Sequence, residues 1–447
     1  MQVKDNAGLS LSAASHECAI LYDDAIGELM HWRNPSRILE AALKADPQFA
    51  MAEIFLAHMD LVSTDKRYAS KAVERLQRIA DMLSRGGYTP REAAHYKALC
   101  VWANGDLIRA AQLLDAILEE YPTDSLAVWM GHQIDFYIGD SKRIRDRIAN
   151  VLPYWDREHP FHSFVVGMHA FGLEEAGESS KAKDVGLAVL ESAPKDVWSI
   201  HAVAHAMEML GEYEEGARFM EDRIADWSAN NVLISHNAIH TILYRLEEGQ
   251  LDRCLYHLDN FVMPKDRKAA LLGLIDGSSA LWRLHLDGVD TGVRMDELAG
   301  NWEKEAEHAF YAFNDIHAVM AFVGSDNHKA VADLITAQKR YLSDTSLAHE
   351  TNYAVTREVG LPVCSALQAF GAGKYEVALD GLTRVRETLI QVGGSHAQRD
   401  AIERTILEAA IRGRNKRAAE QLVAERLRHK PRSPYNLKQQ QRIALMR

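Results

Sequence analysis

The sequence lacks a surplus of positive charge, a long apolar run and a leader-like N-terminus. Asp and Glu total 63 against 51 Lys and Arg, so the formal net charge is −12, and the acidic residues are dispersed along the chain. Because a nucleic-acid-binding surface requires a basic stripe, nucleic acid is not expected as a partner. No run of 18 apolar residues exists, which excludes a membrane-spanning helix. Residues 1–10 do not resemble a signal peptide.

Cysteines are few and widely separated. None of the four has the paired spacing of a zinc ribbon or a disulfide framework. They are Cys18, Cys100, Cys254 and Cys364. We therefore expect reduced, mostly buried thiols in a cytoplasmic protein.

The familiar catalytic fingerprints and a persuasive strand pattern are also missing. We find no Gly-rich phosphate loop, no Gly-x-Ser-x-Gly nucleophile elbow and no dinucleotide-binding motif. What remains is a chain of amphipathic, Ala-rich stretches that are typical of helices.

A turn signal recurs between these stretches. It consists of a Gly followed by a polar residue, and it occurs at Gly105, Gly139, Gly177, Gly211, Gly249, Gly373 and Gly413. The first five glycines are 34, 38, 34 and 38 residues apart, and the last two are 40 apart. These spacings are close to the 34-residue period of tetratricopeptide helix pairs. Since one pair cannot bury its apolar faces alone, the sequence predicts an all-α, tetratricopeptide-like solenoid.

Variations in this pattern divide the predicted solenoid into five parts. We expect a helical cap with opening repeats over 1–90 and regular helix pairs over 91–262. A divergent helical stretch follows over 263–345, and pairs resume over 346–435. Residues 436–447 are expected to form a basic tail.

Two histidine pairs distinguish this chain from a plain scaffold. His201 and His205 are four residues apart, and one repeat later His236 and His240 have the same offset. An offset of four places both imidazoles of a pair on one helix face. In a solenoid the first helices of successive pairs line the concave surface side by side. We therefore expect the two pairs to converge.

Further polar and aromatic residues occupy comparable positions in these and neighbouring repeats. Asp276 and His317 are predicted to complete a catalytic group with the two histidine pairs. The candidates for ligand contact are His169, Trp198, Glu208, Asn237, Trp282, Arg283, Asn314, Asp315, His396, Gln398 and Arg399.

Two chemical interpretations of the histidines stay open. Neutral imidazoles at this offset can hold a divalent metal ion when a third ligand arrives from elsewhere. The metal signal is weak, because Ala202 and Asn237 stand where a His-Glu-x-x-His helix has glutamate. A metal-free site would use a histidine as general acid or base, with Arg283 or Arg399 holding a carboxylate.

Each candidate also has a purely structural explanation. A single helix histidine usually belongs to the core, and a tryptophan usually packs. Asp276 and Arg283 could form a salt bridge, and residues 395–400 could be a helix cap followed by a solvated turn.

Seven segments together form a specific motif set. They are 167–175, 201–205, 225–227, 236–240, 281–284, 313–318 and 393–400. This set resembles the tetratricopeptide repeat protein 38 family over roughly residues 90 to 435. The resemblance implies an all-helical repeat fold and no particular activity. Family members commonly have aromatic residues where this chain has Ala238 and Ile239, so any pocket there would be reshaped.

Two functional hypotheses follow. In the first, the array encloses a pocket for a small molecule, an anionic metabolite among the candidates, and acid-base or metal-assisted chemistry is open to it. In the second, it is a scaffold whose concave surface receives a peptide or partner protein. The first requires the histidines to face one enclosed cavity, and the second an open groove. A homo-oligomer is compatible with both.

Overall fold

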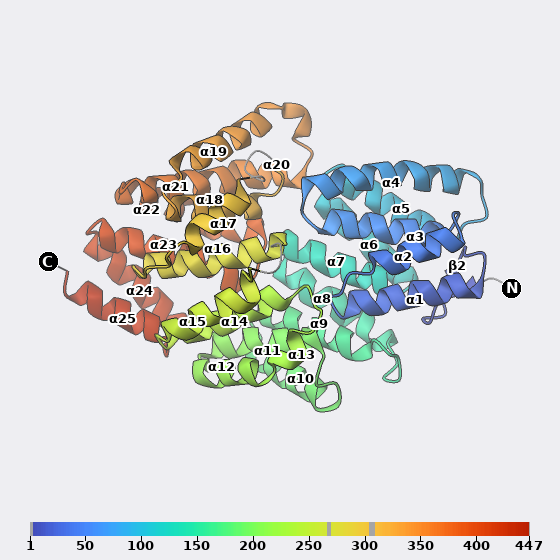
Figure 1. The fold of residues 1–447 in the computed structure, drawn as a ribbon, viewed down its shortest axis with the longest axis horizontal. Coiled ribbons are helices and arrows are strands. Elements are labelled where there is room, and N and C mark those ends of the chain that lie inside the picture. Colours follow the sequence, from blue (N-terminus) through green and yellow to red (C-terminus); the bar gives the residue numbers. More distant parts are fainter. Residues whose placement is uncertain (1–2, 266–269, 304–308, 447) are drawn as a thin grey trace.

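The fold is an all-α helical-repeat solenoid of the tetratricopeptide-like kind, as the sequence predicts. The computed structural model describes residues 3–265, 270–303 and 309–446, and the two chain ends lie at opposite ends of the molecule (Figure 1). Residues 266–269 and 304–308, inside the predicted divergent stretch, lie outside the described residues. A short antiparallel hairpin of β1 (Val3–Lys4) and β2 (Ser10–Leu11) precedes the helices.

The helices follow one another as antiparallel pairs. The N-terminal part contains α1 (His16–Met30), α2 (Ser36–Ala45), α3 (Ala50–Val62), α4 (Lys66–Ser84), α5 (Pro90–Ala103), α6 (Leu107–Glu120), α7 (Ser125–Tyr137), α8 (Ser141–Val151) and the 3₁₀ turn η1 (Leu152–Tyr154). The middle part contains α9 (His162–Glu175), α10 (Ser179–Ser192), α11 (Val197–Leu210), α12 (Tyr213–Asp222), α13 (Ile224–Trp227), α14 (Ile234–Glu247), α15 (Leu251–His257), the π-helical η2 (Leu258–Val262), α16 (Leu271–Leu286) and α17 (Arg294–Trp302).

The C-terminal part continues the array. It contains α18 (Ala312–Gly324), α19 (His328–Ser343), η3 (Thr345–Leu347), α20 (Thr351–Val355), η4 (Thr356–Gly360), α21 (Leu361–Gly371), α22 (Tyr375–Val385), η5 (Arg386–Val392), α23 (His396–Arg412), α24 (Lys416–His429) and α25 (Pro434–Ala444).

The turns between paired helices use the predicted glycines. Six of the seven have left-handed φ values between 70° and 86°. Gly413 is the exception, with φ −75°, and the left-handed residue there is Arg414 at φ 57°. The reason is that α23 ends at Arg412, so Gly413 takes the cap position and the reversal falls one residue later.

Inner and outer helices differ in burial. In α11 every residue from 197 to 208 is buried, and in α14 every residue from 235 to 247. The outer helix α10 buries only Ala182, Gly186 and Leu190, which form one stripe at helical spacing. The inner helices are therefore covered on all sides, whereas outer helices keep one face in water.

The C-terminal helices cover the inner face of the middle repeats. Helix α23 packs on α16 (Figure 1). Arg404 of α23 pairs with Glu247 of α14, with Nη2 2.6 Å from Oε1. Lys430, just after α24, pairs with Glu208 of α11 at 2.9 Å. The concave side of the middle repeats is thus occupied by the chain itself.

The N-terminal part reaches the same inner region from the other side. The backbone N–H of Val232 donates to the Trp32 carbonyl at 2.8 Å. The indole Nε1 of Trp198 donates to the Met30 carbonyl at 3.1 Å. The end of α1 is thereby fixed to the segment before α14 and to α11.

The segment predicted as a basic tail over 436–447 contributes most of α25, up to Ala444. Ser433 caps this helix and Pro434 occupies its first position, where proline is favoured. Gln439 and Ile443 are buried on one face. Lys430 to Pro434 therefore separates two helices rather than ending the array.

No helix within the described stretches is long and apolar enough to cross a bilayer. All four cysteines are free, and Cys18, Cys254 and Cys364 are buried. The expectation of unpaired, mostly buried thiols is confirmed.

Candidate functional site

The two predicted histidine pairs come together. His201 and His205 of α11 and His236 and His240 of α14 are each no more than 6% exposed. One ring nitrogen of each lies within 4.8 Å of the others. The Nε2 atoms of His201 and His205 are 3.0 Å apart, and the His205 and His240 ring centroids are 4.2 Å apart. We call these residues the four-histidine cluster.

The position of the cluster follows from the repeat. Helices α11 and α14 are the first helices of successive pairs, and each carries two histidines four residues apart, on one face of the helix. Asp196 fixes the start of α11, because its side chain accepts a hydrogen bond from the Ser199 backbone N–H at 2.9 Å.

A buried carboxylate from the next inner helix supports the cluster. Asp276 of α16 is fully buried, and its Oδ1 lies 2.9 Å from Nδ1 of His236. Ser235 Oγ donates to the other oxygen at 2.9 Å. The carboxylate thus holds the His236 ring in one orientation through Nδ1.

Two glutamates lie behind the other histidines. Glu174 of α9 has Oε2 3.5 Å from Nδ1 of His205. Glu208 of α11 has Oε2 3.9 Å from Nδ1 of His240, and its Oε1 accepts from Lys430. Three of the four histidines therefore have a carboxylate on the side of Nδ1.

Burial and mutual proximity keep His201, His205 and His240 neutral. Burial, and next the neighbouring histidines, lower the pKa of His201, His205 and His240 well below the usual range. Burial, together with Glu175 and Glu208, raises the pKa of Glu174 well above its usual range. Neither ring nitrogen of His240 has a hydrogen-bond partner within the described residues.

A cavity of about 230 Å³ opens beside the cluster. His201 and His236 contribute to its wall, while His205 and His240 lie outside the lining. Most of the remaining lining is aromatic or aliphatic. It comprises Trp32, Val62, Phe136, Tyr137, Phe171, Trp198, Val232, Leu233, Ala270, Leu271, Leu272, Ile275, Tyr311 and Phe313, with Ser63, Thr64, Gln133, Asn314, Gly394 and Gln398.

Two lining residues have unusual backbone conformations. Trp32 has φ 56° and Thr64 has φ 53°, in the left-handed region that bulky and β-branched residues rarely adopt. The Thr64 carbonyl accepts from the Asn314 side-chain amide at 3.2 Å. The Trp32 carbonyl accepts from Val232. Such conformations cost about 1–3 kcal/mol each and cluster at functional sites.

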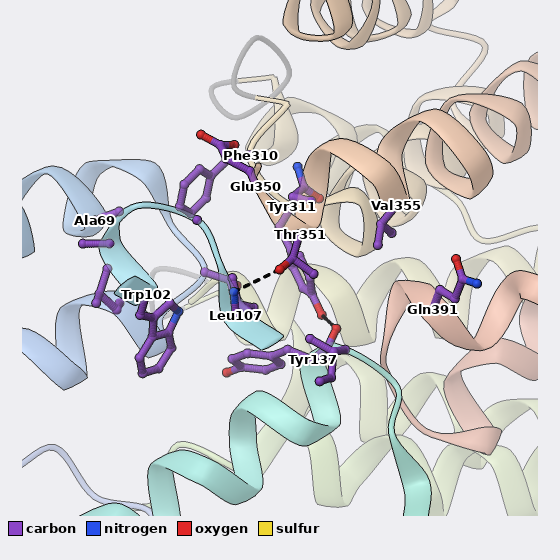
Figure 2. Close-up of a pocket in the computed structure, with 16 residues that line it drawn as sticks. Ala69, Trp102, Leu107, Tyr137, Phe310, Tyr311, Glu350, Thr351, Val355 and Gln391 are labelled. Carbon is purple, nitrogen blue, oxygen red and sulfur yellow. Dashed lines mark hydrogen bonds between the residues drawn. The ribbon is translucent and has the colours of Figure 1, made fainter. Parts of the chain in front are cut away.

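A second cavity, of about 100 Å³, adjoins the first. Tyr137, Tyr311 and Thr64 line both. Figure 2 shows it between α5, α6 and α7 on one side and α20 on the other, with the Leu107 N–H donating to Thr351 Oγ1 at 3.0 Å. The Tyr311 hydroxyl donates to the Tyr137 carbonyl at 3.0 Å (Figure 2).

His317 and His169 do not join the cluster. His317 is buried, and its Nδ1 lies 2.8 Å from the Phe313 carbonyl one turn earlier. Burial lowers its pKa to about 4. His169 is half-buried, and burial, then the Lys181 charge, lowers its pKa. Of the six histidines predicted to face one cavity, His201 and His236 line it, so that expectation is wrong for His169, His205, His240 and His317.

Both arginines predicted to hold a negative group are engaged by protein atoms. Arg283 is buried and donates to the carbonyls of Ser279 at 2.8 Å and Ala397 at 2.5 Å, and burial lowers its pKa to about 10. Arg399 bonds the Gly394 carbonyl and lies 3.6 Å from Glu175. Neither lines the large cavity. Both hold α23 in place, so the geometry does not support anion recognition by them.

Several other candidates serve packing. The Trp282 indole donates to Thr405 Oγ1 at 2.8 Å, and this hydrogen bond joins α16 to α23. The same indole stacks on the His285 ring within α16. Asp276 and Arg283 do not form the salt bridge considered from the sequence, since each has other partners.

The segment over 395–400 behaves as a helix start. Ser395 and Gln398 form a reciprocal capping box, as the alternative interpretation predicts. His396 contacts the Glu175 carbonyl through Nε2 at 3.1 Å. Gln398 differs from a solvated residue, because it is 6% exposed and lines the cavity.

Asp315 and Asn237 are buried but lie outside the cavity lining. Asp315 accepts from the Gln338 side chain at 2.9 Å, and burial raises its pKa to about 7. Both polar side-chain atoms of Asn237 lack partners among the described residues. The predicted residues that line the cavity are Trp198, His201, His236, Asn314 and Gln398.

Some site residues are not assigned from the sequence. Glu174 precedes a repeat turn within the 167–175 motif, and its place in that motif is the signal that could have identified it. Phe171 lies in the same motif, whereas Trp32 and Thr64 carry no such signal, because they reach the cavity only through the closure of the array.

No family model matches the chain. Solved structures with a similar fold include the APC/C hetero-tetramer Cut9–Hcn1. It matches at 14% identity and TM-score 0.44, and the match covers 96% of this chain and 76% of that one. The human IFIT1 dimer with m7Gppp-AAAA matches at 12% identity and TM-score 0.39, covering 98% and 96%. The human IFIT1 dimer with PPP-AAAA matches at 12% and 0.38, covering 99% and 97%. At these values the similarities assign no function.

Proposed function

We propose that this helical-repeat protein binds a small, largely apolar and uncharged molecule in the 230 Å³ cavity, against the wall formed by His201 and His236. The observation that carries the proposal is the contact between this cavity and the buried four-histidine cluster. Concave, mostly apolar sites with a few convergent polar groups are the usual form of small-molecule sites.

The lining defines the ligand class. An apolar cavity of about 150 Å³ can hold benzene, so this one has room for a molecule of one or two rings. Aromatic side chains supply flat contact surfaces, and Asn314, Gln398 and His201 offer polar atoms. No Lys, Arg, Asp or Glu lines the cavity among the described residues. A neutral ligand is therefore favoured over the anionic one considered from the sequence.

Backbone strain supports binding at this place. The left-handed conformations of Trp32 and Thr64 fall on two separate segments of the lining, one after α1 and one after α3. Residues held in such conformations are typical of ligand sites, because the surrounding contacts must over-determine them. Acid-base chemistry by a neutral imidazole at this wall is compatible with the arrangement.

The scaffold alternative has less support. A peptide groove would need an open concave surface, and here α23 and the segment after α24 contact α14, α16 and α11. We further propose that the chain belongs to the tetratricopeptide repeat protein 38 family, on its motif set, and acts in the cytoplasm without nucleic acid, which its net charge of −12 disfavours.

A blocking variant tests the ligand proposal. Val232 lines the cavity but is 51% exposed, so Val232→Trp should fill the entrance without disturbing the fold. Val293, 61% exposed and absent from the lining, provides the matched control Val293→Trp. Indole and naphthalene serve as neutral probes in thermal-shift titrations.

We expect both probes to raise the unfolding temperature of the wild type and of Val293→Trp. In Val232→Trp the apparent dissociation constant should rise at least about ten-fold, which corresponds to about 1.4 kcal/mol. Equal binding to Val232→Trp, or no stabilisation of the wild type by either probe, would contradict the proposal.

A further inference from the structure

The four-histidine cluster has the composition and geometry of a metal centre. We propose that His201, His205, His236 and His240 together bind one divalent first-row transition-metal ion, with Zn²⁺ as the reference ion. Binding of the ion stands on the geometry of the histidines. Its role beside the cavity, as a positive charge behind the His201 and His236 wall, rests on the proposed function and deepens it.

The distances suit a tetrahedral ion. Zn–N bonds of about 2.0–2.1 Å separate the nitrogens of a tetrahedron by roughly 3.3 Å. His201 Nε2 and His205 Nε2 are already 3.0 Å apart, and no pair in the cluster exceeds 4.8 Å. Side-chain adjustments of about 1 Å would close the site around an ion. The helices that carry the ligands are inner helices, so the frame is rigid.

The cluster also contains buried donors and acceptors that the protein does not satisfy. His240 is 1% exposed, and neither of its ring nitrogens has a hydrogen-bond partner among the described residues. Leaving such a group unpaired costs about 1–3 kcal/mol. The Nε2 atoms of His201 and His205, by contrast, are paired with each other at 3.0 Å, close to the separation of two ligands on one ion. An ion between the four rings would take one nitrogen of each as a ligand, and it would give His240 a partner that the described residues do not supply.

The surroundings of the cluster resemble the outer shell of known metal sites. Metal-binding histidines usually donate their second ring N–H to a carboxylate, which fixes the tautomer and orients the ring. Asp276 does this for His236 at 2.9 Å, and Ser235 holds Asp276. Glu174 and Glu208 lie at 3.5 and 3.9 Å from Nδ1 of their histidines.

The surroundings of the buried Glu174 carboxyl group also favour a cation at the cluster. Both of its carboxylate oxygens lack hydrogen bonds, and it is 1% exposed. Lys430 pairs with Glu208, and Arg399 lies near Glu175, but Glu174 forms no salt bridge with Lys or Arg in the described part of the chain. A divalent ion bound through His205 would place a positive charge beside this carboxyl group and favour its ionised form.

The donor set selects the class of ion. Four imidazole nitrogens suit Zn²⁺, Cu²⁺, Ni²⁺ or Co²⁺, whereas Mg²⁺ and Ca²⁺ require oxygen ligands. Four protein ligands around Zn²⁺ are typical of closed, structural centres. We therefore assign the ion first to holding α11 and α14 together at the cavity wall.

The test uses the full-length, untagged protein. It is stripped with a chelator, checked for folding by circular dichroism and titrated with Zn²⁺ alone by calorimetry. Co²⁺ then reports the coordination geometry through its visible absorption. We expect one ion per chain and a tetrahedral Co²⁺ spectrum. A folded, stripped protein that takes up neither ion would overturn the proposal.

Variants locate the site. His240→Gln should lose stoichiometric binding, whereas His317→Gln, at a buried histidine outside the cluster, should keep it. If His240→Gln does not fold, Asp276→Asn replaces it, and the Zn²⁺ dissociation constant should rise about 10- to 100-fold. Unchanged Zn²⁺ affinity in Asp276→Asn and in a folded His240→Gln would refute the assignment.

The two proposals fail independently. Val232→Trp should lose the neutral probes but bind Zn²⁺ like the wild type. Loss of Zn²⁺ binding in Val232→Trp would refute the separation of the two sites. Zn²⁺ uptake without any probe binding would leave the metal centre standing and remove the ligand proposal.

Discussion

Replacing Gly139 by Ala tests whether the array is closed in solution. Gly139 follows α7 with φ 70°, and a Cβ there would overlap the Ile390 carbonyl oxygen and lie 2.8 Å from its carbon. Contacts shorter than about 3 Å do not occur for a methyl group, so either the α7–α8 turn or η5 must move. This seam lies next to Tyr137, which lines both cavities.

The expected loss of stability in Gly139→Ala has two parts. A side chain in the left-handed region costs roughly 1–2 kcal/mol, and overpacking against backbone adds about 1–3 kcal/mol. Gly139→Ala should therefore destabilise the fold by about 2–5 kcal/mol. Gly177 ends the next repeat with φ 86°, and no other atom lies within 4 Å of the place that an alanine methyl would take there. Gly177→Ala should carry only the conformational cost of about 1–2 kcal/mol.

Urea unfolding followed by circular dichroism and tryptophan fluorescence measures the difference. We expect a lower midpoint for Gly139→Ala than for Gly177→Ala, and weaker binding of indole only in Gly139→Ala. Because repeat arrays can unfold in parts, both signals should be compared. Equal midpoints and equal probe binding for the two variants would show that η5 does not rest on the α7–α8 turn.

Two further predictions concern pH. Burial raises the pKa of Asp315 to about 7. Because this is above the pKa in the unfolded chain, the contribution of Asp315 to the free energy of unfolding is present at low pH and is lost as the pH rises through 7. The loss should be about 2–3 kcal/mol between pH 5 and 8. In Asp315→Asn the urea midpoint should not show this fall between pH 5 and 8. The same fall of the midpoint with pH in the variant and in the wild type would contradict the prediction. At Glu221, burial raises the pKa, but hydrogen bonds from Arg245 and His257 outweigh it and lower the pKa to about 2. Its contribution is present above about pH 4.5 and is lost as pH falls toward 2, so Glu221→Gln should flatten acid unfolding; the same acid midpoint in both proteins would refute this.

Local features of the sequence predict local features of the fold. Six of the seven turn glycines have the left-handed conformation that a helix reversal requires. The seventh, Gly413, lies one residue too early, because helix length is not readable to a single position. The helix α25 is missed, since residues 436–447 are expected to form a basic tail, although proline is favoured at the first position of a helix.

The candidate site is predictable to the extent that it repeats. The spacing of four, used once on α11 and once on α14, is enough to bring His201, His205, His236 and His240 together. Periodicity cannot indicate that His317 bonds its own helix carbonyl or that Arg283 and Arg399 bond carbonyls near the start of α23. The Arg283 partner is 114 residues away in the chain, and the two local partners depend on side-chain orientations that residue spacing does not specify.

The sequence by itself determined the helices, their turns and the convergence of the histidine pairs, because each depends on spacings shorter than about one repeat. Only the tertiary structure decided the cavity and the carboxylates behind the histidines. Trp32, Thr64 and Tyr311 reach the same wall from segments far apart in the chain. Lys430 and Arg404 close the concave side from the C-terminal end. This closure depends on small rotations between successive helix pairs that add up over the whole array, so it cannot be predicted from any short stretch of sequence.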